Sequence, residues 1–247
     1  MKVSIITVTY NSAETIEDTL KSVLKQDYSD IEYIIIDGAS TDATLAILGK
    51  YKDNISILIS EKDVGIYDAL NKGVQHATGD VVAILHSDDF YAHSQVISDY
   101  VKVFTETQAQ AVYADLHYVD RVNVSKIVRN WVSGDYKKHS FYWGWMPPHP
   151  TFVVKRELYS TLGLFNLKFK SAADYELMLR FVLKGAISIA YLKEVTVKMR
   201  TGGQSNITLT NRINANREDR MAWKQNGLRP GFFTLYLKPI RKLFQFF

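Results

Sequence analysis

The chain has 247 residues, of which 47% are hydrophobic and 23% are charged, values typical of a soluble globular protein. Its formal net charge is +4, from 30 Lys and Arg against 26 Asp and Glu, and this composition excludes disordered and collagen-like proteins. Cysteine is absent, which excludes a disulfide framework, a thiol nucleophile and a cysteine-ligated metal site. The length suits one large α/β domain or two small ones.

The amino-terminal segment predicts neither a secretory signal nor a membrane span. Residues 1–20 carry one Lys and a short apolar run that becomes polar by Asn11. No stretch approaches the roughly 18 uncharged apolar residues of a membrane-spanning helix. We therefore expect a cytoplasmic protein, and a peripheral position on the inner face of the cytoplasmic membrane is compatible with this expectation.

Four β-rich runs alternate with helical patterns over the first ninety residues. The predicted strands are Val3–Thr9, Ile31–Ile36, Ile55–Ile59 and Val81–Leu85. The predicted helices begin after Ser12, cover about 45–51 and span Ile66–Ala77. This alternation predicts an α/β, Rossmann-like fold with a mostly parallel central sheet flanked by helices.

The regular alternation fades near residue 100. We predict paired strands within 111–132, an irregular segment at 133–150, strands at Thr151–Lys155 and Ile187–Lys198, and helices at Ala172–Leu183 and Leu209–Gln225. No internal repeat or low-complexity linker occurs. A single domain with a carboxyl-terminal extension is the simplest organisation.

Polar clusters follow the predicted strands at their carboxyl ends. Because these ends share one edge of a parallel sheet, the clusters are expected to line one ligand crevice. The clusters are residues 9–11, 37–42, 61–65 and 87–89, and the candidate site residues among them are Thr9, Tyr10, Asn11, Asp37, Asp88 and Asp89. Adjacent carboxylates such as Asp88 and Asp89 suit a hard divalent cation, although such a pair can also cap the next helix. With Asp37 they fit a nucleotide bound through its base, its ribose and a metal-bridged diphosphate.

Two common nucleotide-binding motifs are missing. Residues 9–13, after the first predicted strand, contain no glycine, which disfavours a dinucleotide-dependent hydride transfer. The pattern G-x-x-x-x-G-K-[ST] does not occur either, which disfavours a P-loop kinase or ATPase.

Five short motifs occur in a fixed order along the chain. They are residues 4–11 (SIITVTYN), 35–42 (IIDGASTD), 65–73 (GIYDALNKG), 77–80 (ATGD) and 85–89 (LHSDD). In this order they make the chain resemble the family 2 glycosyltransferases over residues 1–205. Within that family the chain is similar to the branch that builds bacterial exopolysaccharide and lipopolysaccharide, such as the colanic-acid type enzymes.

The resemblance implies a glycosyltransferase A fold, a nucleotide-diphospho-sugar donor with a UDP-sugar favoured, a Mn²⁺ or Mg²⁺ ion, and inversion at the anomeric carbon. It also implies that Asp174, at the start of a late predicted helix, is the catalytic base. The implied donor-binding residues are Thr9, Tyr10, Asn11, Asp37, Asn71 and Asp88, and the implied metal ligands are Asp88 and Asp89.

Four positions depart from the family's pattern. The family often has a second acid where this chain has Gly38, and an arginine where it has Leu70. His86 replaces the leading Asp of a D-x-D pattern, and Ala173 replaces the acid that commonly precedes the base.

Glycosyl transfer needs a carboxylate that takes the proton from the attacking hydroxyl, and Asp174 is the candidate. The alternative is that Asp174 only caps its helix. Glu176 is disfavoured because residues two apart on a helix face different ways.

The aromatic segment at 141–150 is the expected acceptor wall, because aromatic faces pack against sugar rings. Its candidate residues are Trp143, Trp145 and His149. Core packing is the alternative for the two tryptophans, and backbone hydrogen bonding is the alternative for His149.

The tail at 228–247 holds four of the 30 basic residues, none of the 26 acidic ones and five of the twelve Phe. Its apolar residues recur at three- and four-residue steps, at Phe233, Tyr236, Leu237, Ile240, Leu243, Phe244 and Phe247. A basic amphipathic helix of this kind predicts binding to an anionic membrane surface. The alternative is a helix docked on the domain or on the second subunit of a homodimer, and Pro239 would kink it in either case.

The expected organisation is a glycosyltransferase domain at 1–227, divided into a nucleotide-sugar-binding part at 1–100 and an acceptor and catalytic part at 101–227, followed by the tail. The expected function is metal-dependent transfer of a sugar onto a lipid-linked saccharide during cell-surface polysaccharide synthesis. The alternatives are a sugar nucleotidyltransferase and a non-catalytic sugar-binding or scaffolding protein. Nucleic-acid binding is not expected, because the 26 bases and 26 acids of residues 1–227 are interspersed.

Overall fold

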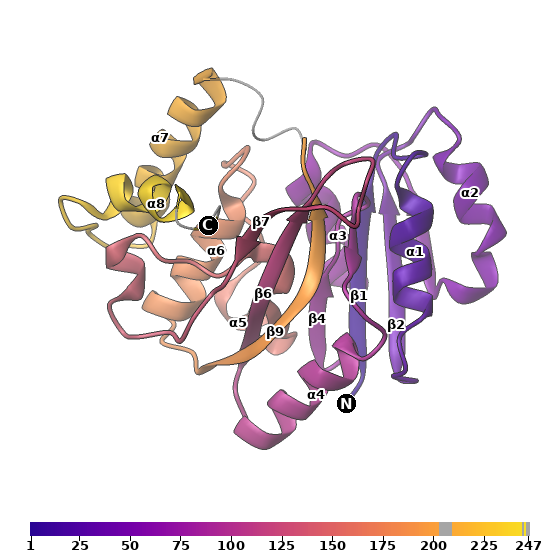
Figure 1. Cartoon of the computed structure of the whole chain (residues 1–247), viewed down its shortest axis with the longest axis horizontal. Helices are drawn as coiled ribbons and strands as arrows, with labels where there is room; N and C mark the ends of the chain where they lie inside the picture. Colours follow the sequence, from indigo (N-terminus) through magenta and orange to yellow (C-terminus); the bar gives the residue numbers. More distant parts are fainter. Residues whose placement is uncertain (203–208, 244, 246–247) are drawn as a thin grey trace.

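A nine-stranded sheet with helices on both faces forms the centre of the computed structural model, which describes residues 1–202, 209–243 and 245, and only the backbone of 209–215, 242 and 243 (Figure 1). The strands are β1 (Val3–Thr9), β2 (Ile31–Asp37), β3 (Ile57–Ser60), β4 (Val81–Ile84), β5 (Asp89–Tyr91), β6 (Ala111–Val119), β7 (Ile127–Trp131), β8 (Val153–Lys155) and β9 (Ile189–Arg200). The spatial order is β3-β2-β1-β4-β8-β6-β9-β5, and β7 pairs with the part of β6 beyond β8.

The sheet joins two parallel groups of strands through one reversed strand. β1 pairs in parallel with β2 and β4, and β2 pairs in parallel with β3. β6 and β9 form a second parallel pair, and β8 runs antiparallel between β4 and β6. The prediction of an α/β fold with a mostly parallel sheet is therefore confirmed, and the direction of β8 brings the carboxyl ends of β4 and β6 to the same edge.

The helices are α1 (Ile16–Leu24), α2 (Thr44–Lys50), α3 (Ile66–His76), α4 (Val96–Thr107), α5 (Glu157–Leu162), α6 (Ala173–Met178), α7 (Leu209–Gln225) and α8 (Thr234–Leu243). A π-helical segment, Leu179–Lys184, continues α6. The sequence did not predict α4 or α5. Four buried residues of α4 nevertheless recur on one helical face, at Val96, Ile97, Tyr100 and Phe104.

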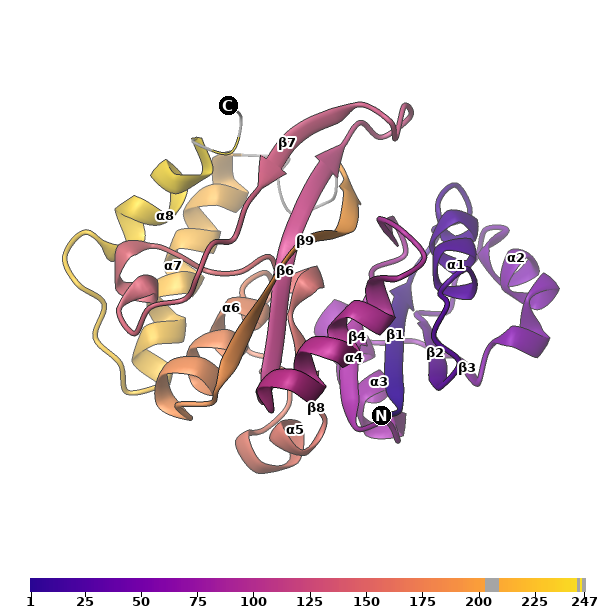
Figure 2. The same ribbon diagram turned by 60° about the horizontal axis from the view of Figure 1, so that its bottom comes forward.

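Two hydrophobic cores form because successive side chains of a strand point to opposite faces. Ile5 of β1 belongs to the core under α1, α2 and α4, whereas Ile6 belongs to the core under α3, α5 and α6. α7 and α8 extend this second core through Trp223 and Leu235. Figure 2 shows the resulting layers, with the sheet between the two groups of helices.

The tail helix α8 is docked on the domain. Leu235 is buried, and the Thr234 hydroxyl donates to the Tyr142 carbonyl oxygen (2.7 Å). Lys238 pairs with Asp219 through both carboxylate oxygens (2.8 and 2.7 Å), and its Nζ lies 3.5 Å from the centre of the Tyr175 ring. Docking on the domain, one of the two expectations for the tail, is thus observed for α8, while Phe244 and Phe247 lie outside the described residues.

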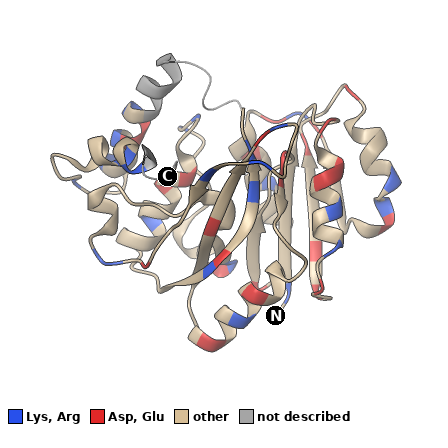
Figure 3. Cartoon of the chain, in the orientation of Figure 1, with Lys and Arg blue, Asp and Glu red and all other residues tan. Residues whose placement is uncertain are grey.

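Charged residues of both signs are spread over the elements on both sides of the sheet (Figure 3). Because Lys238 is paired, the basic excess of the tail is smaller on its surface than in its sequence. Among the helices that the structure describes, none combines the length and the apolar character needed to cross a membrane.

A buried carboxylate ties the strands together at their amino ends, opposite the predicted site. Glu32 of β2 accepts hydrogen bonds from Lys2 Nζ (2.8 Å), from Ser4 Oγ (2.6 Å), and from the backbone N–H (2.7 Å) and hydroxyl (2.6 Å) of Thr78. Burial alone raises the pKa of Glu32, but these hydrogen bonds outweigh it and hold the pKa at about 2.

Replacement of Glu32 by Gln should lower stability in a pH-dependent way. Because the folded state depresses the pKa from 4.5 to about 2, the carboxylate stabilises the fold above pH 4.5, and this contribution is lost as the pH falls towards 2. Urea denaturation should give a loss of about 3 kcal/mol in the free energy of unfolding at pH 7 and none near pH 2. Glu106→Gln, at an exposed position, is the control, and an equal loss at both pH values would contradict the prediction.

Candidate active site

The loops that follow β1, β2 and β4 are tied together at the carboxyl edge of the sheet, and we call this region the strand-end site. Asn11 adopts a left-handed conformation (φ 49°), and its Oδ1 accepts a hydrogen bond from the Thr41 N–H (2.8 Å). Its own N–H donates to Ser40 Oγ (2.8 Å). Ser12 Oγ and Ser87 Oγ lie 2.9 Å apart and join the β1 loop to the β4 loop.

Asp37 supports the β2 loop from beneath. Its side chain is fully buried and accepts hydrogen bonds from the Ser40 N–H (3.0 Å), the Ser40 hydroxyl (2.5 Å) and the Ser60 hydroxyl (2.6 Å). These bonds hold the loop folded back against its strand. Asp37 is therefore placed at the site where the sequence predicts it, and its carboxylate is engaged by its own loop.

Tyr10, Gly38 and Asp63 form the rim of the strand-end site, where Tyr10 is exposed and the other two are half-buried. Tyr10 is 61% exposed, and a Cβ atom at position 38 would lie 2.6 Å from Asp63 Oδ2 and 3.4 Å from Tyr10 Cδ2. Gly38 thus leaves room for a carboxylate from the loop after β3, at the position where the resemblance leads one to expect an acid. The sequence places residues 61–65 among the strand-end clusters but assigns no role to Asp63, and the glycine at 38 is the signal that points to it.

Asp88 and Asp89 lie at the same edge, after β4 and at the start of β5. Asp89 is fully buried, and neither of its carboxylate oxygens has a hydrogen-bond partner among the described residues. Burial raises the pKa of Asp89 well above its usual range and the charge of Asp88 adds to the increase, while the backbone N–H and the charge of Arg200 oppose it. Arg200 donates through Nη1 to the Asp88 carbonyl oxygen (2.9 Å) and through Nη2 to Asp18 (2.5 Å).

This pair fits a divalent cation. A buried carboxylate without partners is costly, and a cation beside it would offset that cost. Adjacent carboxylates also supply the oxygen ligands that Mn²⁺ and Mg²⁺ prefer. Asp88 and Asp89 are therefore the residues that would hold such an ion.

A second group with ligand-type side chains lies at the start of α4, within the described part of the chain. His93, Asp99 and Glu194 place one ligand atom each within 4.8 Å of one another. His93 Nδ1 accepts a hydrogen bond from the Gln95 N–H (3.3 Å), and its Nε2 lies 3.6 Å from Glu194. These contacts account for the group without an ion, and we assign no metal to it.

Asp174 lies in the first turn of α6, and no side-chain cap hydrogen bond forms there, so the capping alternative is not observed. Tyr67 instead donates its hydroxyl to Asp174 Oδ1 (3.3 Å), and His149 Nδ1 lies 3.5 Å from Oδ2. His149 Nε2 lies 3.1 Å from Nε2 of His86. Polar contacts thus run continuously from His86 of the β4 loop through His149 to Asp174, and Tyr67 of α3 contacts Asp174 separately. His86 and Tyr67 were not predicted as site residues.

Both histidines of this series are neutral at pH 7. Burial lowers the pKa of His86 to about 3, with a further contribution from His149. Burial also lowers the pKa of His149, against the opposing charges of Asp174 and Asp88. With a proton on the His149 Nδ1 that faces Asp174, its Nε2 accepts from His86 Nε2–H. His86 Nδ1 then carries no proton, consistent with its having no partner among the described residues.

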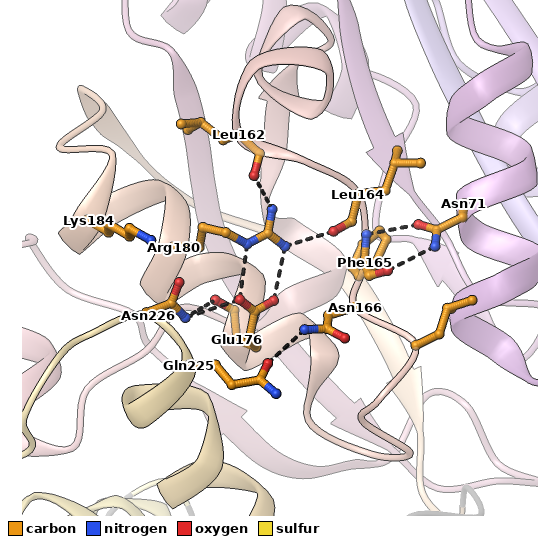
Figure 4. A pocket seen from close by; sticks show the side chains of 11 residues that line it. Asn71, Leu162, Leu164, Phe165, Asn166, Glu176, Arg180, Lys184, Gln225 and Asn226 are labelled. Atoms are coloured by element: carbon orange, nitrogen blue, oxygen red, sulfur yellow. Dashed lines mark hydrogen bonds and ion pairs between the residues drawn. The ribbon is translucent and has the colours of Figure 1, made fainter.

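α6 is fixed by an ion pair on another of its faces (Figure 4). Arg180 forms a bidentate pair with buried Glu176 (3.0 Å each) and donates to the carbonyl oxygens of residues 162–164 at 2.5 to 2.7 Å. Asn226 Nδ2 donates to Glu176 Oε1 (3.1 Å). These groups line a cavity of about 550 Å³, but they hydrogen-bond to one another and to the loop, so we assign the cavity a structural role.

Three further predicted residues engage other parts of the fold. Asn71 forms two hydrogen bonds with the Phe165 backbone, through Nδ2 (2.9 Å) and Oδ1 (2.8 Å) (Figure 4). Trp145 is 6% exposed and donates its indole N–H to the Ser133 carbonyl oxygen (2.7 Å), so it packs in the core. Trp143 is 63% exposed and lies beside α8. Of the three predicted acceptor residues, His149 alone contacts Asp174 in the described structure.

Comparisons with known proteins agree on one family. The family model described as Glycosyl transferase family 2 matches residues 4–163. An uncharacterized glycosyltransferase of Mycobacterium tuberculosis is 33% identical over 185 residues, covering 73% of this chain and 69% of the relative. A PGL/p-HBAD biosynthesis glycosyltransferase of the same species is 30% identical over 207 residues, covering 82% and 78%. The putative teichuronic acid biosynthesis glycosyltransferase TuaG of Bacillus subtilis is 43% identical over 90 residues, covering 35% and 36%.

Solved structures share the fold. S. aureus TarS in complex with UDP-GlcNAc superimposes with a TM-score of 0.70 at 19% identity, over 92% of this chain and 65% of that one. The mannosyltransferase PcManGT of Pyrobaculum calidifontis, in complex with GDP-Man and Mn²⁺, gives 0.68 at 21% identity, over 96% and 68%. The chain therefore spans about two thirds of the length of each of these structures.

Asp89→Asn should separate the metal response from folding. In the wild type, Mn²⁺ at about 100 times its dissociation constant should stabilise the fold by about 2.7 kcal/mol, or roughly 5–10 °C in Tm. The variant should lose this response and, in chelator, melt above the wild type, because folding no longer buries a carboxyl group whose pKa it raises. Thermal melts with and without Mn²⁺ measure both effects, with Asp53→Asn as the exposed control. A full Mn²⁺ response in the Asp89 variant would contradict the assignment.

Proposed function

The chain belongs to glycosyl transferase family 2, and on this premise we propose that it is an inverting, metal-dependent glycosyltransferase that acts on a nucleotide-diphospho-sugar and a saccharide acceptor. The relatives named above are glycosyltransferases, which leaves the nucleotidyltransferase and the non-catalytic scaffold without support. The observation that carries the proposal is the series of contacts from the β4 loop, which bears the acidic pair, to Asp174.

The donor that we propose is a UDP-sugar bound by the loops after β1, β2 and β3. The exposed ring of Tyr10 offers a face on which a base can stack, and Asp63 offers a carboxylate that accepts hydrogen bonds from a base with N–H donors. Thr9 adds a buried hydroxyl oxygen that has no partner among the described residues. The hydrogen bonds of Asp37 and Asn11 hold the loops after β1 and β2 in place.

A Mn²⁺ or Mg²⁺ ion held by Asp88 and Asp89 would neutralise charge on the diphosphate as the nucleotide leaves. Arg200 holds the backbone of this acidic pair through the Asp88 carbonyl oxygen. Because Arg200 is also paired with Asp18, the β4 loop is anchored to α1. The chain's own contribution at this point is a rigid carboxylate pair at a fixed place on the sheet edge.

Asp174 is the proposed general base, and a carboxylate in this role contributes about 10²- to 10⁴-fold to the rate. It accepts the proton of the attacking hydroxyl, and Tyr67 and His149 hold its two oxygens in place. Burial raises the pKa of Tyr67, and the charge of Asp174 adds to the increase, so the tyrosine stays a donor at physiological pH. Among the described residues Asp174 has no second carboxylate in hydrogen-bond contact, and a single base of this kind suits a direct displacement, which inverts the anomeric carbon.

The acceptor that we propose is a lipid-linked saccharide at the inner face of the cytoplasmic membrane. Support comes from α8 and the residues before it, where the side chains of Phe232, Phe233, Tyr236 and Ile240 are 84%, 62%, 58% and 46% exposed. Exposed aromatic and aliphatic side chains beside basic ones suit the interface of an anionic bilayer. Two of the named relatives are described as a PGL/p-HBAD and a putative teichuronic acid biosynthesis glycosyltransferase, which supports a cell-surface glycan and gives no support to the colanic-acid branch in particular.

Asp174→Asn should lower the turnover of sugar transfer by about 10²- to 10⁴-fold while donor binding is retained, because the amide keeps the shape but accepts no proton. Release of nucleoside diphosphate from UDP-, GDP- and dTDP-sugars measures turnover, and a thermal shift with the same donors measures binding. Glu157→Gln, exposed on α5, is the control. Wild-type turnover in the Asp174 variant would remove the assignment of the base.

Phe233→Ser combined with Ile240→Ser should weaken binding to anionic vesicles by at least about tenfold, because two exposed apolar side chains no longer enter the interface. Transfer to a soluble acceptor should be unchanged. This test is cleaner than deletion of the tail, which would uncover the surface that Leu235 covers. Val122→Ser combined with Leu167→Ser, at positions 90% and 51% exposed, is the control, and equal vesicle binding by both double variants would refute membrane docking through α8.

A further inference from the structure

An open pocket of about 450 Å³ lies between the 133–145 segment and α8, and nothing in the proposed reaction uses it. Lys137, Lys138 and His139 line one part of it, and Arg241 of α8 lines another. The one acidic residue of its lining, Asp135, lies 3.6 Å from Lys193 Nζ. Among the described residues, no carboxylate forms an ion pair with Lys137, Lys138 or Arg241. The pocket therefore presents unneutralised positive charge.

The walls of this pocket are held in place by backbone contacts. The Ser133 carbonyl oxygen accepts the Trp145 indole N–H (2.7 Å), and the Gly134 carbonyl oxygen accepts the Tyr113 hydroxyl (2.9 Å). On the other wall, a Cβ atom on Gly144 would lie 2.5 Å from the Lys238 backbone nitrogen, so the segment touches α8 directly. A pocket with fixed walls loses little conformational entropy when a ligand binds.

Trp143 adds an apolar surface at the mouth of the pocket. Its indole is 63% exposed, and its carbonyl oxygen accepts a hydrogen bond from Arg241 Nη1 (3.3 Å). Arg241 follows Ile240 on α8, whose side chain belongs to the exposed apolar face. α8 thus places the Arg241 guanidinium at the pocket and leaves its apolar side chains exposed to solvent.

We propose that this pocket binds the phosphate group of an anionic membrane lipid, while the apolar face of α8 contacts the acyl region. Lysine and arginine donors suit phosphate oxygens, and an indole suits the interface between head group and chain. The inference rests on the proposed membrane function, because it names the lipid group that α8 would meet. Free phosphate carries the same oxygens but lacks the apolar part. A lipid would therefore change the surroundings of the Trp143 indole, and free phosphate would not.

Lys137→Gln combined with Lys138→Gln should weaken binding to phosphatidylglycerol vesicles by roughly 30-fold, at about 1 kcal/mol for each basic residue. The matched control is Lys50→Gln combined with Lys52→Gln, which removes two exposed charges at α2 and should retain wild-type affinity. Equal losses in the two double variants would reduce the effect to general charge and overturn the proposal.

Trp143 supplies a second readout that does not depend on vesicles. Soluble dihexanoyl phosphatidic acid should shift the tryptophan emission of the wild type to shorter wavelength, and the shift should be absent in Trp143→Phe. Inorganic phosphate at the same concentrations should give no shift, and a saturable shift with inorganic phosphate alone would overturn the assignment to lipid. Transfer to a soluble acceptor is measured in parallel, since its absence in the wild type would count against the proposed function and leave the lipid result standing.

Discussion

The bidentate pair between Arg180 and Glu176 is the interaction on which the position of Asp174 depends. Arg180 also binds three successive carbonyl oxygens in the α5–α6 connection, which places Phe165 against the ring of Tyr67 at 5.8 Å between centroids. Tyr67 in turn donates to Asp174. Arg180 thereby ties α6 to the connection, and Asn71 ties α3 to the same connection through the Phe165 backbone. The base candidate is thus held by residues whose own side chains lie outside the strand-end site.

Some residues of the strand-end site hold its loops in place, and others have polar atoms without a partner. Asp37 and Asn11 form hydrogen bonds with neighbouring backbone or hydroxyl groups, so they hold the loops in place. Asp89 differs from them, because its buried oxygens have no partner within the described chain. A carboxylate that the fold leaves unsatisfied is the strongest local indication of an external cation. Acidic residues that look alike in the sequence are therefore distinguished by their hydrogen bonds: the Asp37 carboxylate has partners and the Asp89 carboxyl group has none among the described side chains.

The sequence predicts the first half of the fold well, because β-branched runs and helical spacing report burial directly. The same patterns miss β5 and give no direction for β8, since strands of three residues are defined by their partners and not by their own periodicity. The acidic candidates follow from strand ends and motif order. His86 and Tyr67 lie within these motifs and Asp63 lies in a strand-end cluster, but their partners could not be predicted, because each contact joins segments far apart in the chain. Trp145 illustrates the converse, since an aromatic segment alone does not tell a sugar-binding wall from a core.

Because Gly144 and Lys238 are in close contact, α8 is attached rigidly to the domain and not through a flexible linker. A flexible linker of twenty residues would let a bound enzyme tumble and sample many heights above a surface. A helix packed on the domain instead holds the whole molecule in one orientation relative to any surface that the helix binds. The fold then sets the distance between such a surface and the carboxyl edge of the sheet. An acceptor held at that surface would have to be long enough to span this distance, whatever sugar it carries.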